Sequence, residues 1–323
     1  MIKKIAILTS GGDSQGMNNA VRAIVKSAKA AGIEAFLVYE GYKGLVENLL
    51  VPASEVKIDE YINRGGTFIY SARYVEFKEE ATRLKAKKVL ESHGIEALVV
   101  IGGDGSYHGA QLLHKIGIKT IAIPGTIDND ISSTDFTIGF DTALSAIVEN
   151  VDRIRDTARS HHRCMMVEVM GRFAGDLSLH SGIATGAELI ITAENKMTLK
   201  EISKVVDQQM NVMKKDSMII IVSEHVYDNM DKLSKDVEAA TGVVTRSSIL
   251  AHLQRGGTPT ANERVLATRM GVMAVELLLQ DKSGLAIGIN ENKINALPIL
   301  ESLSQERPKL INEILKITKL NQQ

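Results

Sequence analysis

The sequence alternates between short apolar runs and stretches with helical periodicity. The apolar runs lie at 5–8, 35–39, 97–101, 120–123, 164–170, 189–192 and 218–224, and another strand is expected around 245–253. Segments with helical patterns lie near 18–31, 106–116, 139–160, 199–214, 231–240 and 261–280. Continuous apolar strands that alternate with helices are typical of a mostly parallel sheet covered on both faces. The sequence therefore predicts an α/β protein.

A chain of 323 residues is long enough for two such domains. No linker rich in proline, glycine or serine marks a boundary. We place one boundary near residue 138, where a long helix is expected to begin, and expect the chain to cross back near 251. The prediction is two Rossmann-like, three-layer αβα domains, residues 1–138 with 251–300 and residues 139–250 with 301–323.

Charge and cysteine content exclude several classes of protein. The formal net charge of -1 argues against a broad nucleic-acid footprint, so any anion site must be local. The single cysteine, Cys164, excludes an internal disulfide and fits a reducing compartment. No apolar run approaches the ~20 residues of a membrane-spanning helix, and the N-terminal run is too short for a signal peptide. We expect a cytoplasmic protein that binds neither nucleic acid nor membranes.

One strand ends in a loop that carries two acids. A Pro-Gly pair ends the run 120–123, and Asp128 and Asp130 then flank Asn129. Asp and Asn bond their own backbone in tight loops, so a simple turn explains the pattern. The alternative is a proton acceptor with a supporting acid. The position favours it, because ligands of such sheets bind outside the carboxyl ends of the strands.

Two glycine-rich loops also follow strands, SGGD at 10–13 and GGDGS at 102–106. Glycine lets the backbone approach a ligand, and N–H groups at a helix start attract phosphate, although tight turns alone explain one such loop. Neither loop has the P-loop pattern or a clean GxGxxG. Asp104, in the second loop, suits Mg²⁺ beside phosphate oxygens. A helix N-cap is its simpler interpretation.

Basic residues lie near the same predicted strand ends: Arg73, Arg163, Arg172, Arg246, His252 and Arg255. Arginine suits bidentate recognition of phosphate, whereas a single arginine or histidine is more often surface or packing. Five arginines in a chain with almost no net charge predict two polyanions in one cleft. Each of the loops that carry these acids, glycines and arginines is expected at the carboxyl end of a strand. Tyr42 has two equally supported interpretations, since its ring could stack on an adenine or cover the cleft.

Together these segments resemble the bacterial-type ATP-dependent 6-phosphofructokinases. The resemblance runs from residue 1 to about 290 and rests on TSGGD (9–13), NRGGTFIYSAR (63–73), VVIGGDGSYHGA (99–110), PGTIDNDI (124–131), TIGFDTA (137–143), VEVMGR (167–172) and HLQRGGTP (252–259). The GGDG loop alone is shared with NAD kinases and lipid kinases. GGDG followed about twenty residues later by PGTIDND is specific.

The resemblance implies transfer of the γ-phosphoryl group of Mg-ATP to the 1-hydroxyl of fructose 6-phosphate, the committed step of glycolysis. Asp128 is the implied proton acceptor and Asp130 a supporting acid; the implied catalytic set also includes Gly12, Thr126 and Arg172. The first domain would bind ATP and Mg²⁺ through Gly12, Arg73, Tyr74, Gly103, Asp104, Gly105 and Ser106, with Asp104 on the metal. The second is the implied fructose 6-phosphate domain. The implied sugar-phosphate contacts are Thr126, Ile127, Asp128, Arg163, Met170, Gly171, Arg172, Glu224, Arg246, His252 and Arg255.

The resemblance also concerns assembly, regulation and the phosphoryl donor. Arg163 and Arg246 match arginines that reach in from a neighbouring subunit, which implies a homotetramer. An effector site for ADP or phosphoenolpyruvate is implied at Arg22, Lys26, Arg155, Gly186, Glu188 and Lys215. Glu55 and Met213 stand where an arginine and a lysine are usual, so we expect weak or altered regulation. Glycine at 105 and 125, where pyrophosphate-dependent relatives carry Asp and Lys, looks like the ATP-using form.

Two other interpretations compete with this one. An NAD kinase or lipid kinase is supported only by GGDG, and the PGTIDND and HLQRGG segments argue against it. A catalytically silent sensor on the same fold should have lost its base or metal acid. Asp104, Asp128 and Asp130 are all present, and function is decided by such site residues rather than by the fold.

Overall fold

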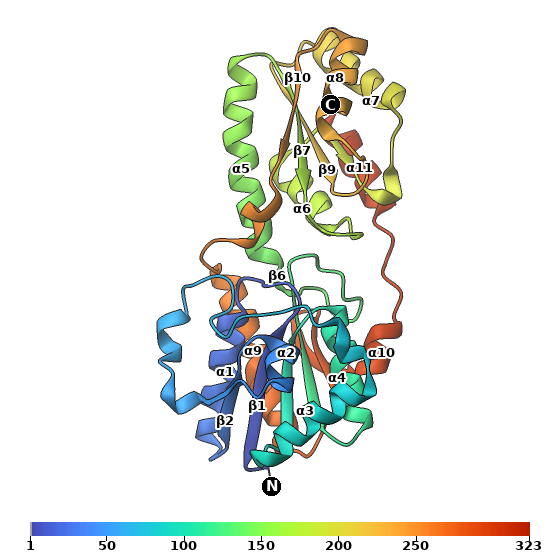
Figure 1. The fold of residues 1–323 in the computed structure, drawn as a ribbon. Coiled ribbons are helices and arrows are strands. Elements are labelled where there is room, and N and C mark those ends of the chain that lie inside the picture. Colours follow the sequence, from blue (N-terminus) through green and yellow to red (C-terminus); the bar gives the residue numbers. More distant parts are fainter. Residues whose placement is uncertain (1) are drawn as a thin grey trace. The chain divides into compact units, whose positions relative to one another are not determined.

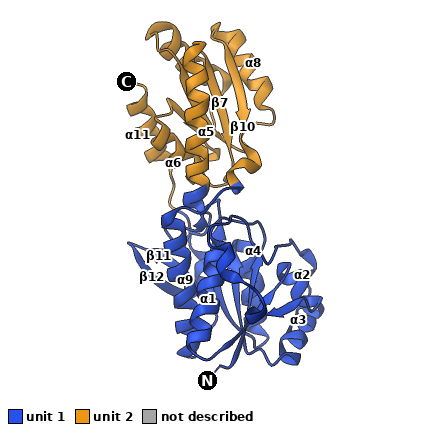
Figure 2. Cartoon of the chain, turned by 90° about the vertical axis from the view of Figure 1, so that its left-hand side faces the viewer, with its two compact units in different colours: residues 1–142, 255–307 blue, residues 143–254, 308–323 orange. Residues whose placement is uncertain are grey.

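The computed structural model describes residues 2–323, which form two compact units (Figures 1 and 2). Unit 1 comprises the residues up to Thr142 together with Arg255–Arg307, and unit 2 comprises Ala143–Gln254 and Pro308–Gln323. The chain therefore passes from one unit to the other after residues 142, 254 and 307. The sequence analysis placed these boundaries after residues 138, 250 and 300. Within residues 2–323, no helix has the length and apolar character needed to cross a membrane.

The described part of unit 1 holds an eight-stranded sheet in the order β12-β11-β5-β4-β1-β2-β3, with β6 paired to β5. Its strands are β1 (Lys4–Ser10), β2 (Glu34–Val38), β3 (Leu50–Pro52), β4 (Ala97–Gly102), β5 (Lys119–Thr126), β6 (Ile138–Gly139), β11 (Leu285–Asn290) and β12 (Lys293–Pro298). Only the edge strands β3 and β12 are antiparallel to their neighbours. The predicted α/β class with mostly parallel strands is confirmed.

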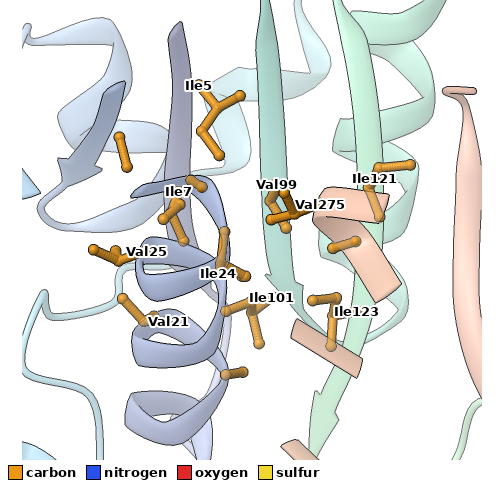
Figure 3. Close-up of a cluster of buried hydrophobic side chains, with 14 of the residues drawn as sticks. Ile5, Ile7, Val21, Ile24, Val25, Val99, Ile101, Ile121, Ile123 and Val275 are labelled. Atoms are coloured by element: carbon orange, nitrogen blue, oxygen red, sulfur yellow. The ribbon is translucent and has the colours of Figure 1, made fainter. Parts of the chain in front are cut away.

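Helices cover both faces of this sheet. They are α1 (Met17–Ala30), α2 (Gly41–Val46), α3 (Glu80–Ser92), α4 (Asp104–Lys115), α9 (Ala261–Leu279) and α10 (Ile299–Ser304), and short 3-10 turns lie at Ala53–Glu55, Ile58–Tyr61 and Val75–Lys78. Successive strand residues point to opposite faces of the sheet. On one face, Ile7 of β1 and Val99 of β4 belong to the same core cluster as Ile24 of α1 and Val275 of α9 (Figure 3). Burial on both faces explains why these strands read as continuous apolar runs.

Unit 2 is built on a parallel sheet in the order β10-β7-β9-β8. The strands are β7 (Cys164–Val169), β8 (Leu189–Ile191), β9 (Met218–Ser223) and β10 (Thr245–Ile249). Its helices are α5 (Phe140–Ser160, which begins in unit 1), α6 (Asp176–Thr185), α7 (Leu199–Val206), a π-helical turn (Asp207–Val212), α8 (Met230–Thr241) and α11 (Ile311–Asn321), and 3-10 turns lie at Ala193–Asn195 and Ala251–Arg255. The core includes Met166, Ile191 and Ile220.

Several local features differ from the sequence analysis, which predicted neither the helix α3 nor the short strands β3 and β6. The strand expected to reach 253 ends at Ile249, where a 3-10 turn follows. The segment after residue 300 contains the end of α10 in unit 1 and all of α11 in unit 2, with Ile314 fully buried. The β11–β12 hairpin was not predicted. Its two-residue turn places Glu291 and Asn292 at positive φ, and the sequence there lacks the glycine that usually signals such a turn.

Candidate active site

The acid loop that follows β5 is fixed by the side chain between its two carboxylates. Asn129 adopts a left-handed backbone conformation (φ 52°), which asparagine tolerates better than most residues. Its Nδ2 donates to the Asp135 carbonyl at 3.1 Å, and its Oδ1 accepts from the Thr137 N–H at 2.9 Å. The buried Asn129 thus ties together both sides of the loop. The half-buried Asp128 and Asp130 flank this tie, and sequence reasoning missed its role.

The strand end beneath the acid loop is equally constrained. Thr126 Oγ1 accepts from the Asp128 N–H at 3.2 Å, and the Thr126 carbonyl accepts from Thr137 Oγ1 at 2.6 Å. The short strand β6 pairs with β5 beside these contacts. The Ile127 side chain is fully buried, so this residue, expected to contact substrate, has only its backbone to offer.

The glycine loop after β4 lies next to the acid loop, because β4 and β5 are neighbours. A Cβ added to Gly103 would lie 3.8 Å from Thr126 Cβ. Ser106 is buried and its Oγ donates to the Ser10 carbonyl at 3.0 Å, so its hydroxyl ties the loop to β1. Asp104 and Gly105 are exposed in the first turn of α4. The loop therefore presents one carboxylate and a helix N-terminus to solvent.

The loop after β1 is held from two sides within unit 1. Ser71 Oγ donates to the Gly11 carbonyl at 2.7 Å, and Arg255 Nη1 donates to the Asp13 carbonyl at 2.8 Å. A Cβ on Gly12 would lie 3.0 Å from that Arg255 nitrogen. Arg255, expected at the sugar 6-phosphate, thus belongs to unit 1 and contacts the loop assigned to the nucleotide. Near Ser71, Arg73 is exposed, and Tyr74 is partly buried against the core.

Tyr42 fits neither of its two expected roles. Its side chain is buried, stacks on Phe77 with ring centroids 4.1 Å apart, and donates its hydroxyl to the Ser106 carbonyl at 2.7 Å. Burial raises the pKa of its phenol well above the usual value. Tyr42 is therefore a core residue beneath the glycine loop, neither an adenine platform nor a cleft cover.

In unit 2, one carboxylate organises the turn after β7. Glu224 Oε1 accepts from the N–H groups of Gly171 at 3.1 Å and Arg172 at 2.6 Å. Both residues have positive φ, 135° and 55°. Gln254 Oε1 accepts from the Met170 N–H at 3.0 Å on the same segment. The carboxylate expected to contact a sugar therefore fixes the backbone beneath the exposed Arg172.

A hollow of about 560 Å³ opens beside Glu224 at this end of the unit 2 sheet. Its lining includes Glu168, His225 and Ile249. Burial, followed by the nearby Glu224 charge, raises the pKa of the Glu168 carboxyl. Such acceptors suit hydroxyl groups better than phosphate, which arginine recognises better.

The remaining arginines of unit 2 lie at the other end of the sheet. Arg163 directly precedes β7, and Arg246 is the second residue of β10. Both sit at amino ends of neighbouring strands, whereas Met170 and Glu224 follow carboxyl ends. The expectation that every such loop lies at a carboxyl end is wrong for these two arginines. At about 3.3 Å per residue, the six residues of β7 separate Arg163 from Met170. His252 is exposed in the 3-10 turn after β10.

The expected effector cations of unit 1 share one internal acid. Arg22 Nε and Lys26 Nζ contact the two oxygens of Asp59 at 2.6 and 2.7 Å. Hydrogen bonds from Lys26 and then Arg22 lower the pKa of the Asp59 carboxyl. Glu55 ends the 3-10 turn that precedes Asp59 in the chain.

The expected effector residues of unit 2 gather around a buried acid. Arg155 Nη1 lies 3.8 Å and Lys215 Nζ 3.6 Å from Glu188 Oε1. Glu188 Oε2 accepts from the Ile219 N–H at 2.9 Å. Gly186 ends α6 in a left-handed conformation, and Met213 is exposed. In the described residues, each of the four expected effector cations is therefore paired with an acid of its own unit.

A buried carboxylate that the sequence analysis did not single out lies at the start of α9. Glu263 is fully buried, and its Oε2 accepts from the N–H and Oγ1 of Thr142 at 3.1 and 3.2 Å. Burial raises the pKa of this carboxyl to about 7. A Cβ on Gly16 would lie 2.9 Å from Glu263 Cγ, which explains a glycine at that position. Glu263 thus connects α9 with the first turn of α5.

A magnesium site can be tested against the donor set. Among residues 2–323, no group of three or more His, Cys, Asp or Glu side chains could hold a metal ion. Mg²⁺ commonly binds through one or two carboxylates plus substrate phosphates and water. The exposed Asp104, in the first turn of α4, fits a site of that kind, in which substrate phosphates and water complete the ligands of the ion.

An acid loop, a glycine loop and exposed arginines are parts that enzymes of phosphoryl transfer use, and the comparisons with known proteins identify the family. The profile of the family described as Phosphofructokinase matches residues 4–278. The chain is 57% identical over 324 residues to the ATP-dependent 6-phosphofructokinase of Mycoplasma mobile, covering 100% of both chains. It is 57% identical over 304 residues to that of Mycoplasmopsis pulmonis, covering 94% of this chain and 93% of the relative.

A solved structure of phosphofructokinase from Saccharomyces cerevisiae matches with a TM-score of 0.85 and 38% identity. The match covers 99% of this chain, which spans 47% of that longer yeast chain. The chain therefore belongs to the phosphofructokinase family, as the motifs predicted.

Proposed function

We propose that this chain is an ATP-dependent 6-phosphofructokinase, which converts fructose 6-phosphate and ATP to fructose 1,6-bisphosphate and ADP in glycolysis. The observation that carries the proposal is the neighbourhood of two loops in unit 1. The acid loop with Asp128 follows β5, and the glycine loop with Asp104 follows the adjacent β4. The first suits an attacking hydroxyl and the second a phosphate group, so one sheet edge carries the parts of phosphoryl transfer.

In the proposed reaction the Asp128 carboxylate accepts the proton of the 1-hydroxyl. That oxygen forms a bond to the γ-phosphorus as the bond from phosphorus to the β,γ-bridging oxygen breaks, and ADP leaves. The Asn129 tie keeps the Asp128 backbone in place. Asp130 is the supporting acid, and the Thr126 hydroxyl, which accepts from the Asp128 N–H, orients the base.

The nucleotide is assigned to unit 1. Gly12, Gly103, Gly105 and the N-terminus of α4 offer backbone to its phosphates, with Arg73, Tyr74 and the backbone of Ser106 beside them. Asp104 would hold Mg²⁺ together with phosphate oxygens, and the ion would neutralise charge that develops on the β- and γ-phosphates.

The sugar phosphate is assigned to residues of both units by role. Met170, Gly171 and Glu224 are assigned to its hydroxyl face. Arg172, whose backbone N–H Glu224 binds, is assigned to the negative charge that develops in the transfer. His252 and Arg255 are assigned to the 6-phosphate.

The position of Arg163 and Arg246 supports a contact with a neighbouring subunit, and the family resemblance implies that the assembly is a homotetramer. A side chain at the amino ends of β7 and β10 cannot act together with loops at the carboxyl ends of the same small sheet. We therefore assign both arginines to the sugar phosphate of a neighbouring subunit.

A cytoplasmic location agrees with the single cysteine, Cys164, which is fully buried. Burial raises the pKa of its thiol to about 12, so the thiol is unreactive.

The proposed activity is tested by ADP release from purified protein with Mg-ATP, with and without fructose 6-phosphate. We expect release that depends strongly on the sugar phosphate. Binding of both ligands without release would point instead to a sensor. Failure to bind fructose 6-phosphate would overturn the acceptor assignment.

Pyrophosphate is expected to be a poor phosphoryl donor. A Cβ at Gly105 would meet no atom within 4 Å, whereas one at Gly125 would lie 3.0 Å from Ile101 Cγ2 and Met17 Cε. A side chain at 105 thus has room beside the nucleotide site. We expect Gly105→Asp to raise KM for ATP about tenfold or more, because like charges about 4 Å apart repel by ~1–4 kcal/mol. Gly105→Asn controls for size, and turnover with pyrophosphate comparable to ATP would contradict the donor assignment.

Regulation by phosphoenolpyruvate and ADP is expected to be weak. Four cations face Asp59 and Glu188, and Glu55 adds a further negative charge. A multiply charged effector must compete with these acids. Saturation curves in fructose 6-phosphate, with and without phosphoenolpyruvate, should nearly coincide. The double variant Glu55→Arg with Met213→Lys should separate them. A strong inhibitory shift in the unmodified enzyme at low effector concentration would refute this expectation.

A further inference from the structure

Arg246 is folded back onto its own chain. Its Nη1 donates to the carbonyl of the preceding residue, Thr245, at 2.7 Å, and to Glu238 Oε2. A guanidinium bonded to the preceding carbonyl lies along its own strand rather than extended away from it. Half of the side chain is nevertheless exposed. Arg246 is therefore retracted, but its own chain does not enclose it.

The partner of Arg246 is itself firmly placed. Glu238 lies on α8, and its Oε2 also accepts from the Thr245 N–H at 3.0 Å. That backbone hydrogen bond, followed by the bond from Arg246, lowers the pKa of the Glu238 carboxyl, and the charge of Arg163 lowers it further. Glu238 thus stays ionised near neutral pH and acts on both arginines at the amino ends of β7 and β10.

The surroundings leave room for Arg246 to move. A surface hollow of about 620 Å³ adjoins the pair, lined among others by Lys235, Glu238 and Arg246. Lys235 carries a positive charge and therefore cannot form an ion pair with the guanidinium of Arg246. Asp231, the other acid of the lining, hydrogen-bonds to Ser247 Oγ.

We propose that Glu238 is a positioning residue that holds Arg246 in a retracted state, and that the arginine must leave this carboxylate to bind the sugar phosphate. The inference rests on the proposed function, which assigns Arg246 to that phosphate. The exchange replaces a carboxylate by a phosphate group on the same guanidinium, so the internal ion pair reduces the apparent affinity for fructose 6-phosphate. Glu238 would take no part in the chemical step.

The test is Glu238→Gln in the full-length enzyme. The amide oxygen can still accept from Thr245, so the fold is kept while the charge is removed. We expect the concentration of fructose 6-phosphate that gives half-saturation to fall about two- to fivefold, the range typical of one exposed ion pair. Turnover number and KM for ATP should not change, which separates this role from a structural one.

Asp236→Asn is the matched control. Asp236 lies on the same helix, two residues away, and its Oδ2 pairs with Lys232 at 2.6 Å rather than with an arginine of the site. The Asp236→Asn variant also removes one negative charge from this helix. Its half-saturating concentration of fructose 6-phosphate should nevertheless stay at the wild-type value. An equal fall in both variants would show a general effect of charge and overturn the inference.

Arg246→Ala separates the inference from the proposed function. If it raises half-saturation by fructose 6-phosphate while Glu238→Gln leaves it unchanged or raises it, the arginine binds substrate but Glu238 does not restrain it, and only the inference fails. If Arg246→Ala leaves half-saturation unchanged, the assignment of Arg246 to the sugar phosphate fails first. A fall in Glu238→Gln together with a rise in Arg246→Ala supports both.

Discussion

Asp128→Asn is expected to lower kcat by about 10²–10⁴, the usual range for loss of a general base. Asparagine keeps the size of the side chain but cannot accept the hydroxyl proton. The tie made by the neighbouring Asn129 is untouched, so the loop should keep its shape. KM for ATP and for fructose 6-phosphate should change little. Steady-state kinetics with both substrates varied would measure the effect.

Asp135→Asn is the control for this prediction. Asp135 lies in the same loop, but its carboxylate is exposed and accepts from the Glu291 N–H at 2.9 Å. The same change of charge there should leave kcat near the wild-type value. Near-native turnover in Asp128→Asn would mean that another group accepts the proton.

The second large effect is expected at Glu263, in its contribution to stability. Burial raises its pKa from 4.5 to about 7 in the folded protein. The folded state therefore holds this proton more tightly than the unfolded state. The contribution is fully present below about pH 4.5 and is lost as the pH rises through about 7. Wild-type protein thus bears the cost of a buried charge at pH 8 and little of it at pH 5.

Glu263→Gln should remove that dependence. Between pH 5 and pH 8, the free energy of unfolding of this variant should increase by about 2–3 kcal/mol relative to that of wild type, so the variant becomes the relatively more stable protein at pH 8. The comparison cancels any constant effect of the substitution, such as a weaker hydrogen bond from Thr142. Urea unfolding at both pH values, at one protein concentration, would measure it.

Glu276→Gln provides the comparison for burial. Glu276 is exposed on the same helix, α9. Both variants lose one glutamate charge, but only one loses a buried charge. If the two variants gave the same change between pH 5 and pH 8, burial of Glu263 would not be its cause.

The fold was predictable because its signal is local. Strands buried on both faces, such as β4 and β5, are continuous apolar runs, and the loops with Asp104 and Asp128 follow them directly in sequence. Parallel order then brings these loops to one edge. The β11–β12 hairpin was missed because its turn, Glu291-Asn292, lacks the usual glycine.

The rest of the site depends on contacts between distant segments. Glu224 contacts residues 53 and 52 positions away in sequence, which no local pattern indicates. The burial of Glu263 and of Tyr42 likewise follows from packing between elements. The amino-end position of Arg163 and Arg246 already followed from the predicted strands at 164–170 and 245–253, which start where β7 and β10 start, and the sequence analysis overlooked it.

The division of each unit into separate chain segments has a consequence for synthesis on the ribosome. Strand β11, which pairs with β5, and helix α9, which packs on α1, are made only after the 112 residues of 143–254. At about 5–20 residues per second this takes about 6–22 s. During that interval the nascent chain exposes one edge of β5 and the apolar face of α1. Chaperones that bind nascent chains would therefore meet unit 1 in an unfinished state.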